Sequence, residues 1–113
     1  MDHAGRITRL QRKIGDLGVD ALFVTNLTNV RYLTGFSGTN GQVLVTPSDA
    51  FFFTDPRYSA RAGQLVTGAE VEIYPTRVTD SLAPRLAGIG AKSVGVEATT
   101  MTLADRDKLV EAL

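Results

Sequence analysis

The chain has 113 residues, of which 43% are hydrophobic and 21% are charged, and its twelve Lys and Arg residues balance twelve Asp and Glu residues. This length and composition predict one folded domain and exclude a disordered or low-complexity chain. The balanced charge gives no net field that would attract nucleic acid or an acidic membrane, and the absence of cysteine excludes a disulfide framework, a cysteine-ligated metal and a thiol nucleophile.

Neither a membrane span nor a secretion signal is visible in the sequence. No apolar run approaches the roughly 18 residues that a spanning helix needs. Residues 1–6 lack the apolar core of a signal peptide. We therefore expect a cytoplasmic protein that has no membrane partner and no nucleic-acid partner.

The first predicted element is a helix over about residues 4–17, ended by a left-handed Gly18. One face carries apolar residues at spacings of three, four and three: Ile7, Leu10, Ile14 and Leu17. The cations outside this stripe predict a solvated face in preference to a binding patch; they are Arg6, Arg9, Arg12 and Lys13. Residues 19–24 then read as a short buried strand.

A second, short helix follows, capped by Thr25 or Asn26 and ended by Gly35. Its expected apolar side consists of Leu27, Val30 and Leu33. Residues 42–46 and 50–54 predict two strands, and the turn residues 47–49 between them predict an antiparallel hairpin. Phenylalanine occupies positions 51–53, so neighbouring rings must point to opposite faces, and we expect both faces of the sheet to be covered.

Asp55 and Pro56 predict the start of a helix that runs to about residue 66. We expect its buried face to carry Tyr58, Ala62 and Leu65. Two later strands are predicted at 70–74 and 93–96. Between them we expect a helix that is capped by Thr79 or Asp80, runs through residue 87 and is broken by Gly88 and Gly90. A last helix, capped by Thr102, shows no stop signal, which predicts that the chain continues. Alternating strands and helices with one hairpin predict an α/β domain with a mixed sheet.

Local catalysis is not expected. His3 is the only histidine, so neither a metal centre nor a serine nucleophile has the imidazole partners that such chemistry normally needs. Glu70 and Glu72 share one face of a strand and predict a solvated edge.

The glycine loop at positions 35, 38 and 41 has the spacing Gly-x-x-Gly-x-x-Gly without a lysine. It matches neither a P-loop nor the dinucleotide fingerprint, and it follows a helix where those motifs precede one. We expect a structural loop, in which glycines supply positive φ and close backbone approach and Ser37, Thr39 and Asn40 hydrogen-bond their own turn.

Two runs resemble a known family: Asn-Val-Arg-Tyr-Leu-Thr-Gly-Phe-Ser-Gly-Thr-Asn-Gly at 29–41 and Thr-Asp-Pro-Arg-Tyr at 54–58. With Asp-Ala-Leu-Phe-Val-Thr at 20–25 and Ser-Val-Gly-Val-Glu at 93–97, they are similar to the N-terminal domain of the creatinase/prolidase/Xaa-Pro aminopeptidase family, the pita-bread metallopeptidases. The resemblance implies a three-layer ribonuclease-H-like α/β fold over residues 1–113, with a mixed sheet of about five to six strands flanked by helices. It also implies a C-terminal catalytic domain, absent from this chain, that binds two divalent ions of manganese, cobalt or zinc.

By the same resemblance the chain is a non-catalytic domain of an Xaa-Pro aminopeptidase or dipeptidase that shapes the substrate pocket and supports a homodimer or higher homo-oligomer. Its implied partners are its own catalytic domain and short proline-containing peptides, and no metal or cofactor is expected in this chain itself. The candidate pocket or interface residues are Asn29, Arg31, Tyr32, Phe36, Ser37, Asp55, Arg57 and Tyr58, with Gly35, Gly38 and Gly41 as the structural loop.

Alternatives remain open for these residues. Arg31 either pairs with a peptide carboxylate or forms an internal salt bridge, and Tyr32 either packs on a substrate side chain or is a core ring. Asp55 and Arg57 face the site, or cap and brace their helix, or instead tie the hairpin to the glycine loop. A stand-alone small-ligand-binding module and a pure oligomerisation module are the alternative functions.

Overall fold

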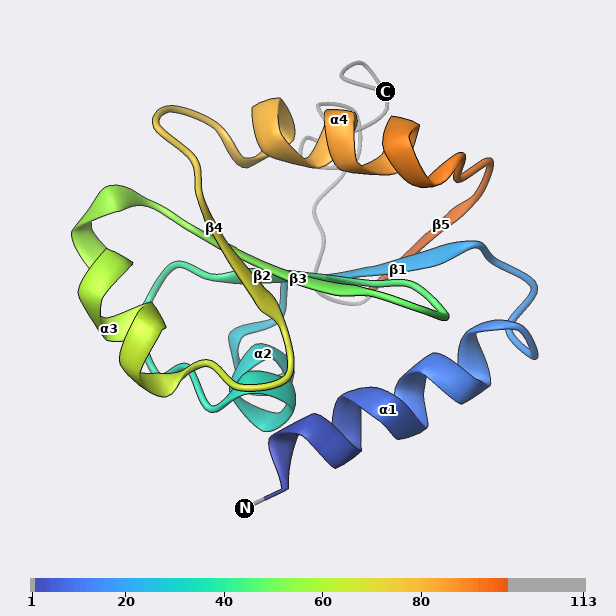
Figure 1. Ribbon diagram of the computed structural model, residues 1–113, viewed down its shortest axis with the longest axis horizontal. Helices are drawn as coiled ribbons and strands as arrows, with labels where there is room; N and C mark the ends of the chain where they lie inside the picture. The colour runs from blue at the N-terminus through green and yellow to red at the C-terminus, as the bar shows by residue number, and fades with distance from the viewer. Residues whose placement is uncertain (1, 98–113) are drawn as a thin grey trace.

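A computed structural model describes residues 2–97 as an α/β fold, a mixed sheet with helices on both faces (Figure 1). The elements are α1 (His3–Ile14), β1 (Ala21–Val24), α2 (Leu27–Thr34), β2 (Gln42–Val45), β3 (Ala50–Thr54), the 3-10 turn η1 (Pro56–Tyr58), α3 (Ser59–Leu65), β4 (Glu70–Ile73), α4 (Val78–Ile89) and β5 (Val94–Val96). The predicted fold class is confirmed. The helix predicted from Thr102 lies outside the described residues.

The sheet has five strands in the order β4-β3-β2-β1-β5. Strand β2 is antiparallel to both β1 and β3, which confirms the predicted hairpin, whereas β1–β5 and β3–β4 are parallel pairs. Strands β1, β3, β4 and β5 therefore run in one direction and end at the same edge of the sheet. We call this edge the carboxyl edge and the opposite one the amino edge.

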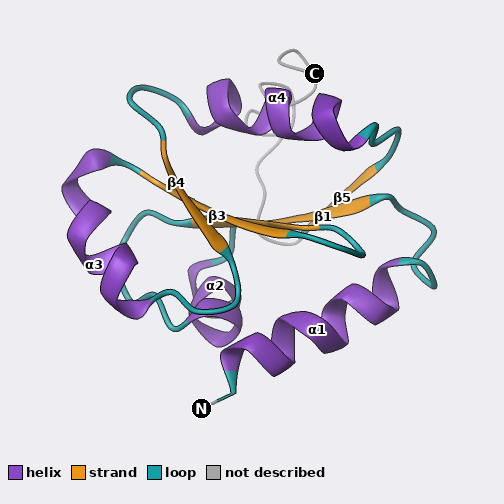
Figure 2. Ribbon diagram, in the orientation of Figure 1, coloured by secondary structure: helices purple, strands orange, loops and turns teal. Residues whose placement is uncertain are grey.

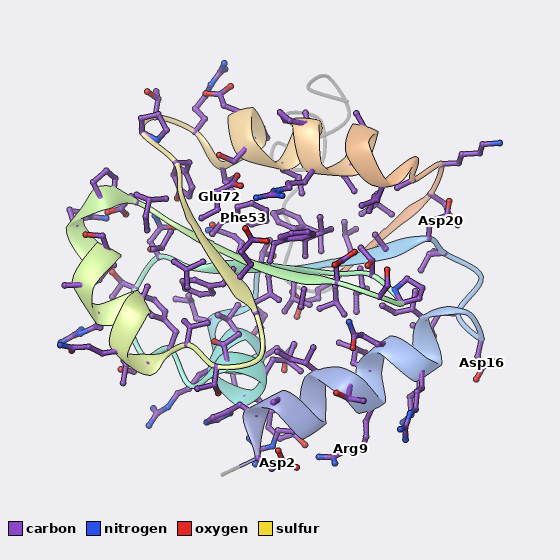
Figure 3. All side chains as sticks on the ribbon, viewed as in Figure 1. Asp2, Arg9, Asp16, Asp20, Phe53 and Glu72 are labelled. Carbon is purple, nitrogen blue, oxygen red and sulfur yellow. The ribbon has the colours of Figure 1, made fainter. Side chains whose placement is uncertain are left out.

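The sheet separates two hydrophobic cores. Helices α1, α2 and α3 cover one face and α4 covers the other (Figure 2). Phe52 belongs to the core under α1 and α2, and its neighbours Phe51 and Phe53 belong to the core under α4. Phe53 points from the sheet toward α4 (Figure 3). The alternation of side chains along a strand thus buries all three rings, as predicted.

Helix α1 is shorter than predicted. The Asp2 side chain caps it by accepting a hydrogen bond from the Gly5 amide at 2.9 Å. The helix ends at Ile14, because Gly15 and Asp16 are poor helix formers, and Gly18 has the expected positive φ of 75°. Ile7 and Ile14 are buried, but Leu17 lies past the helix end and is 58% exposed, so its predicted burial was wrong.

Two other apolar residues were also predicted to be buried and are not. Leu27 occupies the first position of α2, where it remains 42% exposed, while Val30 and Leu33 are buried. Leu65 is the last residue of α3 and is 36% exposed. Val66 follows it in extended conformation and packs against the core in its place.

Helix α4 begins earlier and ends later than predicted. Arg77 occupies the cap position without a capping side chain, so neither Thr79 nor Asp80 is the cap. Asp80 lies instead in the first turn, where a negative charge favours the helix N-terminus. Gly88 is accommodated inside the helix, and Gly90 ends it with a φ of 68°.

Candidate functional site

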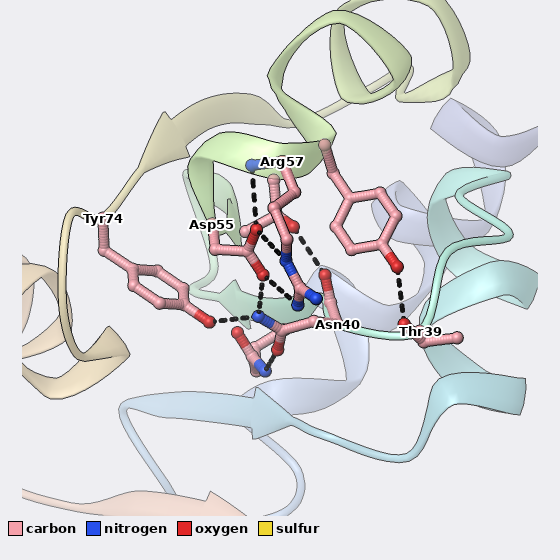
Figure 4. A network of polar contacts seen from close by, with 8 residues as sticks. Thr39, Asn40, Asp55, Arg57 and Tyr74 are labelled. Carbon is pink, nitrogen blue, oxygen red and sulfur yellow. Dashed lines mark hydrogen bonds and ion pairs between the residues drawn. The ribbon is translucent and has the colours of Figure 1, made fainter.

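Polar side chains from three separate segments meet at the carboxyl edge (Figure 4). Thr39 and Asn40 come from the loop before β2, Asp55 and Arg57 follow β3, and Tyr74 follows β4. Ligands of open α/β sheets bind outside the carboxyl ends of the strands. This edge is therefore the candidate functional site.

Asn40 is the centre of the network. Its Nδ2 donates to Asp55 Oδ2 and to the Tyr74 hydroxyl, both at 2.6 Å. Its Oδ1 accepts from Gln42 Nε2 at 2.9 Å, and its backbone carbonyl accepts from Thr54 Oγ1 at 2.5 Å. Asn40 thus joins the loop to β2, to β3 and to the residue after β4, whereas we expected it to hydrogen-bond its own turn.

Asp55 has every acceptor position occupied by a donor. Its Oδ1 accepts from the Arg57 amide and from Arg57 Nε, and its Oδ2 accepts from Arg57 Nη2, each at 2.9 Å, in addition to Asn40. These hydrogen bonds, first from the Arg57 guanidinium and then from Asn40, hold the pKa of Asp55 well below its usual range. The predicted helix cap is confirmed, and Asp55 also ties the hairpin to the glycine loop.

Arg57 is oriented and yet accessible. Its two bonds to Asp55 form a bidentate fork, and the paired carboxylate raises the pKa of Arg57. The Arg57 side chain is nevertheless 73% exposed, whereas that of Asp55 is 15% exposed. A guanidinium held in one direction at the surface can bind an anionic group without first losing its own conformational freedom.

Tyr58 closes the other side of the network. Its hydroxyl lies 2.6 Å from Thr39 Oγ1, and this hydrogen bond lowers the pKa of Tyr58. Its ring meets Phe36 edge to face, with centroids 5.5 Å apart. Phe36 is only 1% exposed and also packs on Phe52, so it supports the loop from the core.

The loop glycines serve two different purposes. Gly35 ends α2 with a φ of 84°, as predicted. Gly38 and Gly41 do not have positive φ, so the prediction that they supply positive φ to the loop was wrong. A Cβ at Gly38 would collide with the Phe36 ring, and one at Gly41 would lie 2.9 Å from the Phe52 ring, so both positions require close approach to an aromatic side chain.

A second polar cluster ties the end of β5 to the start of α2. The Glu97 carboxylate accepts from the Thr25 amide at 2.5 Å, from the Asn26 amide at 2.9 Å and from Asn29 Nδ2 at 2.6 Å. A carboxylate is favoured at this position because a helix N-terminus presents unpaired amides. Asn29 was a candidate residue, and Glu97 was missed because its partners lie about 70 positions away in the sequence.

The remaining candidates lie outside the Asn40 network. Arg31 and Ser37 are exposed, and within residues 2–97 Arg31 forms no internal salt bridge. Tyr32 is 56% exposed, so it is not a core ring. The Arg6 guanidinium lies 4.0 Å from the centre of the Tyr32 ring.

Within residues 2–97, no group of three or more His, Asp and Glu side chains is placed to hold a metal ion. His3 Nδ1 lies 3.1 Å from the Tyr32 carbonyl oxygen. Glu70 and Glu72 are not merely solvated, because both pair with Arg85, at 3.4 and 2.8 Å. In the same part of the chain, every helix is too short or too polar to span a bilayer.

Two open hollows lie at the amino edge, away from the Asn40 network. The larger, about 520 Å³, lies between the β2–β3 turn and the turn that joins α4 to β5. The smaller, about 360 Å³, is lined by Phe51, Glu70 and Arg85 among others. The larger is lined mainly by turn residues, and in the smaller Glu70 and Arg85 already pair with each other.

Comparison with known proteins gives consistent matches. The sequence model of the creatinase/prolidase N-terminal domain matches residues 6–113. A crystal structure of the N-terminal domain of cytoplasmic peptidase PepQ from Mycobacterium tuberculosis H37Rv is 38% identical, with a TM-score of 0.88 over 96% of this chain and 85% of that one. An Xaa-Pro dipeptidase from Bacillus anthracis is 30% identical, with a TM-score of 0.93 over 98% of this chain.

Full-length relatives extend well beyond the matched region. The chain covers 31% of the Bacillus anthracis dipeptidase. It covers 28% of an uncharacterized peptidase, YqhT, from Bacillus subtilis (strain 168), to which it is 34% identical over 97 residues. The chain therefore spans about a third of these relatives or less.

Proposed function

This chain belongs to the creatinase/prolidase N-terminal domain family, and we propose that it is the non-catalytic N-terminal domain of an Xaa-Pro aminopeptidase or dipeptidase. Support comes from the family match over residues 6–113 and from similarity to an Xaa-Pro dipeptidase at 30% identity. The proposed enzyme hydrolyses short peptides that carry proline in the second position, and it acts in the cytoplasm.

The catalytic metal ions are assigned to the proposed C-terminal domain. Two divalent ions of manganese, cobalt or zinc would supply an activated water and polarise the scissile carbonyl there. Residues 2–97 do not bring together a metal-binding group, so no metal ligand is assigned to them.

The proposed task of this domain is to form one wall of the substrate pocket with its carboxyl edge. The observation that carries this proposal is the Arg57 guanidinium, which is fixed by two bonds to Asp55 and remains 73% exposed. A planar guanidinium matches the geometry of a carboxylate, such as the free C-terminus of a short peptide. Arg31, also exposed, is a second candidate partner for the same group. The domain thereby restricts the substrates to short peptides, because only these can reach Arg57 and Arg31.

The 113-residue chain alone is expected to show no activity. Incubation of the purified chain with Xaa-Pro dipeptides and tripeptides in the presence of Mn²⁺ should give no hydrolysis above the no-enzyme rate. Robust metal-dependent turnover would contradict the assignment of catalysis to another domain.

Kinetics of the full-length protein test the role of the carboxyl edge. Arg57→Ala should raise KM for an Xaa-Pro dipeptide about tenfold and leave kcat nearly unchanged, because an interaction equally strong in the ground and transition states contributes to binding only. Arg61→Ala removes an exposed arginine from the neighbouring helix α3 and is the matched control. Equal kinetic constants for Arg57→Ala, Arg31→Ala and wild type would favour a pure oligomerisation role.

The proposal also includes support of a homodimer or higher homo-oligomer. Sedimentation velocity of the full-length protein and of the 113-residue chain tests it, and a monomer for both would remove this part of the proposal.

A thermal-shift screen with nucleotides and phosphate separates the proposal from a stand-alone ligand module. Saturable stabilisation would favour the module, since a ligand that binds only the native state raises its apparent stability.

A further inference from the structure

Helix α1 carries four cations and no carboxylate of its own. The helix contains Arg6, Arg9, Arg12 and Lys13 and no acidic residue. Arg9, Arg12 and Lys13 are exposed, and none of them forms an ion pair with any residue in the described part of the chain. Arg9 points away from the sheet (Figure 3). We call these four side chains the basic face of α1.

The cations on the other side of the sheet are arranged differently. Arg85 of α4 pairs with Glu70 and Glu72, and Arg77 at the start of α4 pairs with Asp80. The net formal charge of the whole chain is zero. Within residues 2–97, Arg9, Arg12 and Lys13 of α1 form no ion pair, whereas Arg77 and Arg85 near α4 both have carboxylate partners.

An exposed aromatic ring adjoins the basic face. Tyr32 of α2 is 56% exposed, and the Arg6 guanidinium lies over its ring at 4.0 Å. Arg6 Nη1 also donates to the Tyr32 carbonyl at 2.8 Å, so one arginine holds both the ring and the backbone of this residue. A ring fixed in this way loses little conformational entropy on binding, and Tyr and Arg dominate the energetically important residues of protein interfaces.

We propose that the basic face of α1, with Tyr32 as its aromatic anchor, is a docking surface for a partner protein that presents an acidic patch. Charge complementarity favours such a partner, and the adjacent tyrosine supplies the apolar contact that a protein interface needs at its centre. This proposal goes beyond the function proposed above and does not depend on it.

The boundaries of the basic face favour a compact acidic patch over an extended polyanion. Helix α1 has 12 residues and is therefore roughly 18 Å long. Asp2 and Asp16 lie at its two ends, and both are exposed (Figure 3). A nucleic acid or an anionic membrane would extend past the helix and meet these two carboxylates, whereas a small acidic patch on a protein would not.

Fluorescence anisotropy with the 113-residue chain tests the proposal. The probe is a fluorescein-labelled peptide of glutamate, aspartate and phenylalanine, and a second peptide carries glutamine and asparagine in place of the acids. Arg9→Glu/Arg12→Glu should weaken binding of the acidic peptide at least about tenfold at low salt, because it reverses two unpaired charges. Tyr32→Ala should weaken it at least about fivefold. Circular dichroism spectra and melting curves check that both variants remain folded.

The matched control is Arg77→Glu/Lys92→Glu, which makes the same change in net charge at the N-cap of α4 and in the turn between α4 and β5. It should change the affinity less than about twofold. Equal weakening by the control, or equal binding of the amide peptide, would overturn the proposal. Tighter binding of duplex DNA or of phosphatidylserine vesicles, reduced by Arg9→Glu/Arg12→Glu but not by Tyr32→Ala, would overturn it in favour of a general polyanion surface.

Discussion

Arg57 and Arg85 both bind carboxylates, and their two clusters differ in what they leave accessible. Arg57 forms a fork on the single carboxylate of Asp55 and is 73% exposed. Arg85 is shared between Glu70 and Glu72, lies 4.5 Å from the centre of the Phe51 ring and is 35% exposed. Pairing with a carboxylate alone therefore does not decide whether an arginine stays accessible to solvent.

The surroundings of each cluster explain the difference. Asp55 accepts a hydrogen bond from Asn40, which is itself hydrogen-bonded to Tyr74 and Gln42. The carboxylate that binds Arg57 is therefore fixed in position. Glu70 and Glu72 lie on the edge strand β4, and Arg85 of α4 binds both. The Asp55 cluster presents a cation to solvent, while the Glu72 cluster fastens a helix to a sheet edge.

The difference between the Arg57 and Arg85 clusters depends most strongly on Asn40. Asn40→Leu should lower the free energy of unfolding by roughly 2–4 kcal/mol, because Asp55, Tyr74 and Gln42 all lose a hydrogen-bond partner. Urea denaturation measures the change. Ser37→Ala, at an exposed position of the same loop, should stay within about 0.5 kcal/mol of wild type. A similar midpoint for both variants would show that the network does not stabilise the carboxyl edge.

The packing of Gly38 against aromatic rings in the same loop should give the second largest change in stability. A Cβ at Gly38 meets the ring of Phe36 and lies 3.1 Å from the ring of Tyr58, so Gly38→Ala should destabilise the protein by about 1–3 kcal/mol. A Cβ at Gly63 in α3 would meet no atom within 4 Å, and Gly63→Ala should stabilise by about 0.5–1 kcal/mol. Thermal melts that shift in the same direction for both variants would contradict this account.

The pH dependence of stability sharpens the role of Asp55. Its folded-state pKa lies below the unfolded value of about 3.9, so its contribution is complete above that pH and is lost as the pH falls through the lower folded-state pKa. We expect the melting-temperature difference between wild type and Asp55→Asn to be largest near neutral pH and to shrink below about pH 4. A difference that stays constant from pH 7 to pH 3 would mean that the ionised carboxylate is not what matters.

Local signals in the sequence were sufficient for much of the fold. The Asp55 cap, the Gly35 stop and the hairpin around residues 47–49 each depend on neighbouring residues, and each is confirmed. Periodicity failed at the helix ends, where Leu17 and Leu27 continue an apolar pattern that no longer faces the core.

The candidate site was harder to predict than the fold, because its contacts are distant in sequence. Arg57 and Asp55 lie in the run at 54–58, whose composition predicts a candidate site. Asn40 was assigned to its own turn, since nothing in a single sequence indicates that Tyr74, 34 positions later, would meet it. Glu97 was missed as a partner of Asn29 for the same reason.

The smallest predicted effect concerns the Glu72 cluster. Arg85→Met keeps an apolar stem over Phe51 and removes both ion pairs, so the free energy of unfolding should fall by about 1 kcal/mol. Arg77→Met removes the more exposed pair with Asp80 and should cost less than about 0.5 kcal/mol. Urea denaturation at low and high salt measures both changes. If Arg85→Met also raised KM for an Xaa-Pro dipeptide in the full-length protein as much as Arg57→Ala, exposure would no longer distinguish the two arginines, and the assignment of the carboxyl edge as the pocket wall would lose its main support.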